Sequence, residues 1–200
     1  VLYEEGGSTR GMNIYLYGGE LYVGGGNTWL AESNWAGTYL KTDQITAGQW
    51  HHVGLVLDGG STVQPGGITA YLDGTPFDTG PGSQLWGHIN NIGIGDINES
   101  TKLHTGVATD GAFAGMIDEV RVYNRALAAS EIQDLATDLL TTDPNRILVA
   151  YWAFDEGSGP TAVDSSPSGQ DNSGSLLGNT AWNTFGLNGS VGFDGQDDSV

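Results

Sequence analysis

The chain has 200 residues, 33 of them glycine and none cysteine, and its formal net charge is −18. Such an acidic chain repels the phosphates of nucleic acids and of anionic lipids, so neither is an expected partner, and the lack of cysteine excludes disulfides and zinc–thiolate sites. Short apolar stretches separated by many glycines favour an all-β fold with many turns.

The first half of the chain predicts a series of short strands. Two alternating apolar runs around Gly18-Gly19 predict a hairpin over Asn13–Gly25. Two more strands are expected over Trp50–Gly60 and Gly67–Phe77, with a turn at Asp73-Gly74. A short strand over Asn90–Asp96 leads into a polar loop.

The second half predicts a long strand over Gly115–Leu127, followed by a helix that starts near Ala128. The helix is indicated by apolar residues that share one face, namely Ile132, Leu135, Ala136 and Leu139. Residues 141–147 read as a linker, and the apolar run ILVAYWAF then starts another strand.

Several of these segments follow one another as in a known family. They are a W-H-H-V strand from Trp50, a Y-x-D-G turn, an I-G-x-G strand, and an F-x-G-x-I-D-E-V-R-x-Y strand before a short helix. Over residues 1–137 the chain resembles the laminin-G-like, concanavalin-like jelly rolls of bacterial multidomain proteins. The resemblance implies an all-β sandwich of two antiparallel sheets with one short helix. Ala128 stands where the family often has a helix-capping serine, so we expect no capping box with Glu131.

The segment beginning YWAFDEGSG resembles the opening strands of the same kind of domain, although it comes last here. Residues 1–140 therefore read as the rear two-thirds of a jelly roll, and residues 148–200 as the front of one. Either the chain is an out-of-phase part of a tandem array, or it closes into one permuted sandwich, and the two are compatible. The permuted form requires Ala150–Phe154 to pair with Ile117–Tyr123. The strand position left vacant would stay open or be filled by a neighbouring copy through strand exchange.

Catalysis is not expected. Glucanases with this fold use carboxylates in an E-x-D-x-x-E strand, which places them on one face, and the chain has no such spacing. The adjacent Asp118 and Glu119 would point to opposite faces of a strand. His51 and His52 are also adjacent, and we expect both to be structural.

A calcium ion is the expected cofactor, because the chain has 24 acidic residues and calcium is bound by oxygen atoms such as those of carboxylates. Resemblance to laminarinase-type sandwiches implies that Asp118 holds the ion with Asp155 or Glu156, and with Asp164 further along. The alternative is that Asp118 accepts backbone hydrogen bonds and no ion is bound.

A second calcium candidate is the loop after the I-G-x-G strand, where Asp96, Asn98 and Glu99 supply oxygens. Its position resembles the acidic loop of pentraxins, but the expected partner carboxylate near Ser8–Gly11 is missing. The alternative is an ordinary polar loop. The segment FDGQDDSV is a third candidate, or simply a turn, and it offers Asp194, Asp197 and Asp198.

Carbohydrate binding would require exposed aromatic rings. Trp29, Trp35 and Tyr39 lie in a glycine-rich segment without clean apolar alternation, and they are the candidate binding residues. Packing in the core is the alternative for each of them. We expect core positions for Trp50, Trp152 and Trp182.

These patterns predict a non-catalytic extracellular or cell-surface recognition or adhesion module. It would be stabilised by calcium and would bind a glycan or a cell-surface protein. The alternative is a structural spacer or self-assembling repeat unit without a small ligand. No apolar run is long enough to cross a bilayer, so membrane insertion is not expected.

Overall fold

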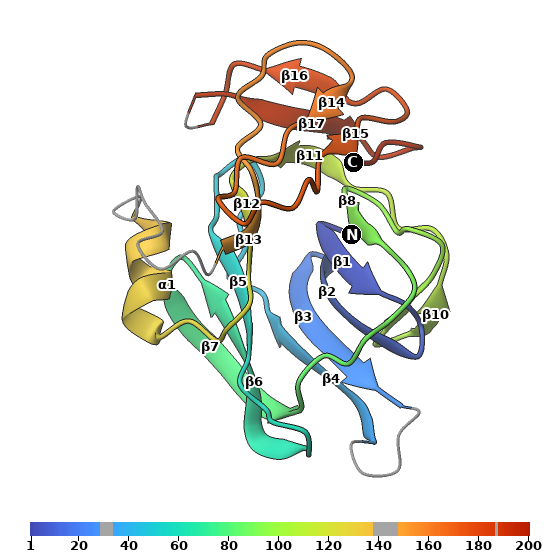
Figure 1. Ribbon diagram of the computed structural model, residues 1–200, viewed down its shortest axis with the longest axis vertical. Helices are drawn as coiled ribbons and strands as arrows, with labels where there is room; N and C mark the ends of the chain where they lie inside the picture. The colour runs from blue at the N-terminus through green and yellow to red at the C-terminus, as the bar shows by residue number, and fades with distance from the viewer. Residues whose placement is uncertain (29–33, 138–147, 187) are drawn as a thin grey trace.

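A computed structural model describes residues 1–28, 34–137, 148–186 and 188–200 (Figure 1). The described residues form short strands and a helix. In chain order these are β1 (Tyr3–Gly6), β2 (Arg10–Tyr17), β3 (Glu20–Asn27), β4 (Trp35–Thr42), β5 (Val53–Leu57), β6 (Gln64–Leu72), β7 (Thr75–Gly82), β8 (Ile92–Ile94), β9 (Thr101–Leu103), β10 (Gly106–Ala108), β11 (Ala114–Ile117), β12 (Val120–Tyr123), α1 (Ala129–Ala136), β13 (Leu148–Trp152), β14 (Thr161–Ala162), β15 (Gly174–Ser175), β16 (Ala181–Asn183) and β17 (Ser190–Asp194).

The largest sheet has five antiparallel strands in the order β4-β3-β2-β1-β8. Its centre is the predicted hairpin, in which β2 and β3 pair without interruption from Arg10↔Asn27 to Tyr17↔Glu20. Gly18 and Gly19 form the turn with φ angles of 61° and 85°, which glycine adopts without strain. The prediction of this hairpin is confirmed.

A second sheet, β5-β6-β7, contributes to the same core. The turn between β6 and β7 lies at Asp73-Gly74, as predicted. The core cluster draws alternate residues from β3 and β6 and further residues from β2 and β4, as expected for two packed antiparallel sheets. Its buried members are Ile14, Leu21, Val23, Trp35, Leu40, Ile68, Ala70 and Leu72.

The segment after residue 148 joins the rest of the fold through two antiparallel ladders. β12 pairs with β13 from Val120↔Trp152, and β11 pairs with β17 up to Ile117↔Val191. The predicted contact between Ala150–Phe154 and Ile117–Tyr123 is therefore present as a backbone ladder over Val120–Tyr123 and Leu148–Trp152. A second core cluster combines residues from both parts of the chain, namely Ile94, Ile117, Ala150, Trp152, Phe154, Ala162, Val191 and Phe193.

The sheets are more divided than the predicted pair. The described strands fall into six sheets, and the strand predicted over Gly115–Leu127 is broken into β11 and β12. Glu119 lies at the break with φ of 56°, and Phe154 on the partner segment has the same φ. This left-handed conformation lies far from the extended β region, so the backbone leaves the extended conformation at both residues. The fold class remains all-β.

Two further segments differ in detail from the prediction. The polar loop after β8 contains the β9–β10 hairpin, which short polar sequences do not reveal. Helix α1 starts at Ala129, and the Glu131 carboxylate accepts a hydrogen bond from the Ala128 N–H at 2.8 Å. The half of the capping box that needs no serine is thus retained. The predicted linker 141–147 and Leu139 lie outside the described residues.

Candidate functional site

The outer face of the five-stranded sheet carries tyrosines. Side chains alternate along a strand, so Ile14 and Leu21 enter the core while Tyr15 and Tyr22 point to the opposite face. Tyr15 and Tyr22 are direct cross-strand neighbours and stack with ring centroids 5.1 Å apart. The β9–β10 hairpin lies over this face and contributes Leu103 to the same cluster.

Three rings form what we call the aromatic corner: Tyr17, Tyr22 and His104. The His104 ring stacks on Tyr22 at 4.2 Å between centroids, with an interplanar angle of 5°. Tyr17 stands nearly upright against His104, at 4.9 Å and 78°. Tyr17 is 54% exposed and His104 is exposed as well, so the corner faces solvent.

Polar groups border the aromatic corner. The Lys41 ammonium lies 2.7 Å from Glu20 Oε1, and the Tyr22 hydroxyl donates to Glu20 Oε2 at 2.9 Å. These hydrogen bonds, first the one from Lys41 and then the one from Tyr22, lower the pKa of Glu20, and the carboxylate raises the pKa of Lys41. The corner thus has an anionic and a cationic group beside exposed rings.

The aromatic residues suggested by the sequence lie elsewhere. Trp35 is 2% exposed in the first core cluster, where its indole N–H donates to Thr38 Oγ1 at 3.0 Å, so its ring face is unavailable to a ligand. Tyr39 is half-buried and donates to the Lys102 carbonyl at 2.8 Å. A β-bulge between these two positions of β4 turns them to opposite faces. Trp29 lies outside the described residues.

The three tryptophans expected in the core differ in exposure. Trp152 is 3% exposed, as expected, and Trp182 is half-buried with its indole N–H donating to the Gly159 carbonyl at 2.8 Å. Trp50 is 49% exposed, so its expected core position is wrong. It precedes β5 rather than lying within that strand. Tyr17 and Tyr22 were readable from the hairpin pattern, whereas His104 follows the β9 strand that the sequence did not predict.

The first calcium candidate is spread over several hydrogen-bonded groups. Asp164 accepts hydrogen bonds from the backbone N–H groups of Tyr151 and Ser166 and, through its second oxygen, from Asn172 at 2.7 Å. Burial opposes ionisation of Asp164, but these hydrogen bonds outweigh it and lower its pKa. Asp164 therefore acts as a backbone cap.

The other acidic residues of this candidate lie close to the backbone of nearby segments. They are Asp118, Asp155 and Glu156. Glu156 Oε1 accepts a hydrogen bond from the Val163 N–H at 2.8 Å. A methyl group at Gly186 would collide with the Asp118 carboxylate, and one at Gly189 would lie 3.5 Å from Asp155 Oδ1. Among the described residues, these acidic side chains do not form a group of three whose oxygens lie within 4.8 Å of one another.

The loop of the second calcium candidate contacts the carboxylate of Glu4, which the sequence analysis did not single out. Asp96 Oδ1 accepts from the N–H groups of Ile97 and Gly111, and Glu99 Oε2 accepts from Asn90 at 3.0 Å. The Asn98 N–H donates to Glu4 Oε1 at 2.9 Å. Glu4 is fully buried, and this burial raises its pKa to about 8 against the opposing effect of the Asn98 hydrogen bond.

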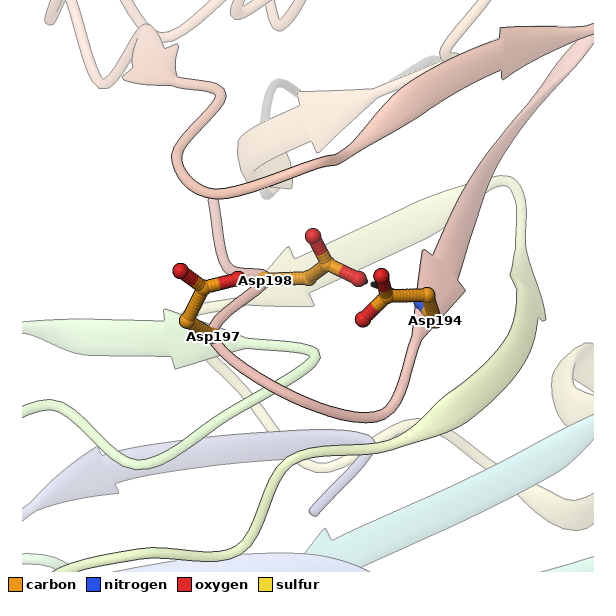
Figure 2. Close-up of side chains that lie close together, drawn as sticks. All are labelled: Asp194, Asp197 and Asp198. Atoms are coloured by element: carbon orange, nitrogen blue, oxygen red, sulfur yellow. Dashed lines mark hydrogen bonds between the residues drawn. The ribbon is translucent and has the colours of Figure 1, made fainter.

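The third candidate is the described group in which three carboxylates meet (Figure 2). One oxygen from each of Asp194, Asp197 and Asp198 lies within 4.8 Å of the others. Asp194 ends β17, and Gly195, with φ of 83°, starts the turn that returns the chain. Asp198 is fully buried and lies between the other two side chains.

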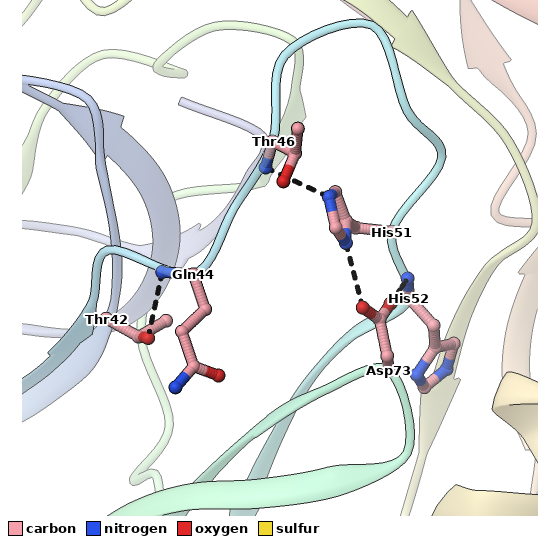
Figure 3. A network of polar contacts seen from close by, with 6 residues as sticks. All are labelled: Thr42, Gln44, Thr46, His51, His52 and Asp73. Carbon is pink, nitrogen blue, oxygen red and sulfur yellow. Dashed lines mark hydrogen bonds and ion pairs between the residues drawn. The ribbon is translucent and has the colours of Figure 1, made fainter.

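The His51 ring and the backbone N–H of His52 both bind the Asp73 carboxylate (Figure 3). His51 Nδ1 lies 2.8 Å from Asp73 Oδ2, and His51 Nε2 accepts a hydrogen bond from the Thr46 N–H at 3.0 Å. The Asp73 carboxylate also accepts from the His52 N–H at 2.9 Å. Because both ring nitrogens of His51 are occupied, this histidine–aspartate pair has no nitrogen left to act as a general base. It fixes the start of β5 to the β6–β7 turn.

Comparison with known families agrees with the architecture. The described helix is too short and too polar to span a bilayer. No curated protein matches the chain. The sequence model of the concanavalin A-like lectin/glucanases superfamily, of laminin-G type, matches residues 3–133, which is more than half of the chain. The chain therefore belongs to the concanavalin A-like lectin/glucanase superfamily, with a laminin-G-like domain.

Proposed function

We propose that the protein is a non-catalytic, extracellular recognition module that binds carbohydrate through the aromatic corner. The observation that carries this proposal is the exposure of Tyr17 and His104 on a rigid stack. The stack is held from below by Tyr15, whose hydroxyl lies 2.8 Å from His104 Nδ1 and accepts from the His104 N–H. Rigid, partly exposed aromatic rings bind ligands at low cost in conformational entropy.

The chemistry of the corner suits a sugar. The C–H face of a pyranose can stack on the Tyr17 ring, because aromatic side chains provide large apolar contact area. Sugar hydroxyls can then bond to Glu20 and Lys41, which lie beside the rings and are already hydrogen-bonded to each other. Fixed polar groups next to an apolar surface are what orient a small ligand.

The same groups argue against hydrolysis. A glycosidase needs one carboxylic acid with a raised pKa and a second free carboxylate. Glu20 is instead held ionised by Lys41 and Tyr22. Lectin-type domains of this family are generally not enzymes. The net charge of −18 fits an extracellular setting, in which a cell-surface glycan or protein is the partner.

A glycan array tests the proposal, read out with the wild type, Tyr17→Ala and His104→Ala. Phe185→Ala is the matched control, since Phe185 is 63% exposed and is not part of the corner. We expect at least one class of oligosaccharide to bind the wild type and the control, and to lose at least tenfold in affinity in both corner variants. Incubation of the bound sugar with the protein should leave it intact.

Two results would reject the proposal. Binding that is equal in all four proteins would place the ligand away from the corner. Absence of glycan binding, together with concentration-dependent polymers in light scattering, would favour the spacer or self-assembling unit instead.

A further inference from the structure

We propose that Asp194, Asp197 and Asp198 bind a calcium ion that fastens the turn after β17 to the five-stranded sheet. This triad is distinct from the aromatic corner, so calcium binding can be tested independently of carbohydrate binding. It is also distinct from Asp118 and Asp155, which belong to the first calcium candidate.

The geometry of the turn presents oxygen atoms at one point. One carboxylate oxygen of each aspartate lies within 4.8 Å of the other two, a spacing that a central cation can bridge. Calcium prefers oxygen ligands at 2.3–2.6 Å and tolerates irregular arrangements, with carbonyls and waters completing its shell. Gly178 packs so closely against the backbone and side chain of Asp197 that a methyl group there would collide with both. The neighbouring chain thus holds Asp197 in place.

A second observation concerns Asp198, the buried member of the triad. Its side chain is fully buried, and its Oδ1 has no hydrogen-bond partner among the described residues. The other oxygen, Oδ2, accepts from the Asp194 N–H. Burying a carboxylate with an unsatisfied oxygen is costly unless a cation or a donor compensates it. None of the ion pairs formed in the described ranges includes a member of the triad.

The carboxylate oxygens of Asp194 are also only partly satisfied by hydrogen bonds. Its Oδ1 accepts from the Gln196 N–H at 3.0 Å, and the contacts of its Oδ2 with the described residues are long, 3.3 Å to Gln196 Nε2 and 3.4 Å to Asn179 Nδ2. Three aspartates at this distance repel one another when ionised. A divalent cation removes both the repulsion and the unsatisfied oxygen of Asp198, which is why we assign the triad to a cation rather than to a turn.

The position of the triad indicates what the ion would do. Directly after Asp198, Ser199 pairs with Leu177, and Val200 exchanges two backbone hydrogen bonds with Ile94 in β8, of 2.9 and 3.1 Å. An ion bound to the turn would therefore hold this short stretch against β8. Calcium then couples the strands after residue 148 to the sheet that carries the aromatic corner.

Titration of the metal-free protein with CaCl₂ tests the assignment, using calorimetry for binding and thermal unfolding for stability. The variants are Asp198→Asn, Asp194→Asn and Asp197→Asn. Asp58→Asn is the charge control, because Asp58 is exposed and lies before β6. Asp118→Asn is included to test the other candidate site. Circular dichroism in EDTA checks that each variant is folded.

We expect millimolar CaCl₂ to raise the melting temperature of the wild type, Asp58→Asn and Asp118→Asn by several degrees, since a ligand of the native state stabilises it. The rise should be lost in Asp198→Asn and reduced in the other two triad variants. In NMR spectra, the Ile94 and Val200 amide signals should shift on calcium addition. No calcium binding in the wild type, loss of binding in Asp118→Asn alone, or an equal response to MgCl₂ would overturn the proposal. Glycan binding that survives Asp198→Asn but not Tyr17→Ala would separate the two sites.

Discussion

Replacing Glu4 with glutamine should flatten the pH dependence of stability. The Glu4 side chain is fully buried on β1, between β2 and β8. Burial raises its pKa from 4.5 to about 8. Its cross-strand neighbour is Asn13, and among the described residues neither Glu4 Oε2 nor Asn13 Oδ1, both buried, has a hydrogen-bond donor. A protonated Glu4 can supply the missing donor to Asn13.

The sign of the pH dependence follows from the protonation of Glu4 in the folded and in the unfolded protein. Between pH 4.5 and pH 8 the folded protein keeps a proton on Glu4 that the unfolded chain has already lost. Stability from this group is therefore greatest below pH 4.5 and falls as the pH rises to about 8. At about 1.4 kcal/mol per pKa unit, the loss reaches roughly 5 kcal/mol as an upper bound, because relaxation around the charge reduces it.

Glutamine does not titrate, and its amide can donate to Asn13 while its oxygen accepts from Asn98. Urea unfolding at pH 5 to 8.5 in EDTA should show the wild type losing several kcal/mol relative to Glu4→Gln over this range. Glu99→Gln, a surface carboxylate on the neighbouring loop, should follow the wild type. If the curves of Glu4→Gln and the wild type run parallel, Glu4 is not a buried acid and this reasoning fails.

Much of the fold was predictable because local patterns and packing agree. The hairpin around Gly18-Gly19 combines alternation with the residues its turn requires, and both survive in the structure. The pairing of β12 with β13 followed from the order of family motifs rather than from either strand alone. The breaks at Glu119 and Phe154 were not predictable, since non-glycine residues rarely adopt positive φ and tertiary contacts impose it here.

The candidate sites were less predictable, because they depend on which residues meet in space. Asp164 and Asp198 look alike in sequence, yet backbone donors satisfy Asp164 whereas Asp198 keeps an unsatisfied oxygen. Trp35 and Tyr39 were both candidate binding residues, but a bulge of one residue on β4 places them on opposite faces of the sheet. Glu4 carried no signal, because an acidic pair in a strand is ordinarily solvated.

Two further predictions concern the stability of the shared core and of the helix. Trp152→Ala should cost about 3–5 kcal/mol and shift the whole urea transition, because Trp152 lies in the cluster that joins both parts of the chain; separate transitions by fluorescence and circular dichroism would contradict a shared core. Glu131→Gln should cost under about 1 kcal/mol. The Arg125 ion pair and the Ala128 N–H lower the pKa of Glu131 to about 2, so this contribution is present above pH 4.5 and disappears as the pH falls toward 2. A difference between Glu131→Gln and the wild type that persists at pH 2 would refute that explanation.

NMR mapping of a bound oligosaccharide tests the central claim most directly. The sugar selected by the glycan array is titrated into ¹⁵N- and ¹³C-labelled protein, and perturbed signals are assigned to residues. The account predicts that the largest shifts occur at Tyr17, Tyr22, His104, Glu20 and Lys41, with Trp35 and Phe185 unaffected. Shifts that cluster on another surface, or no saturable shifts with any oligosaccharide, would contradict it.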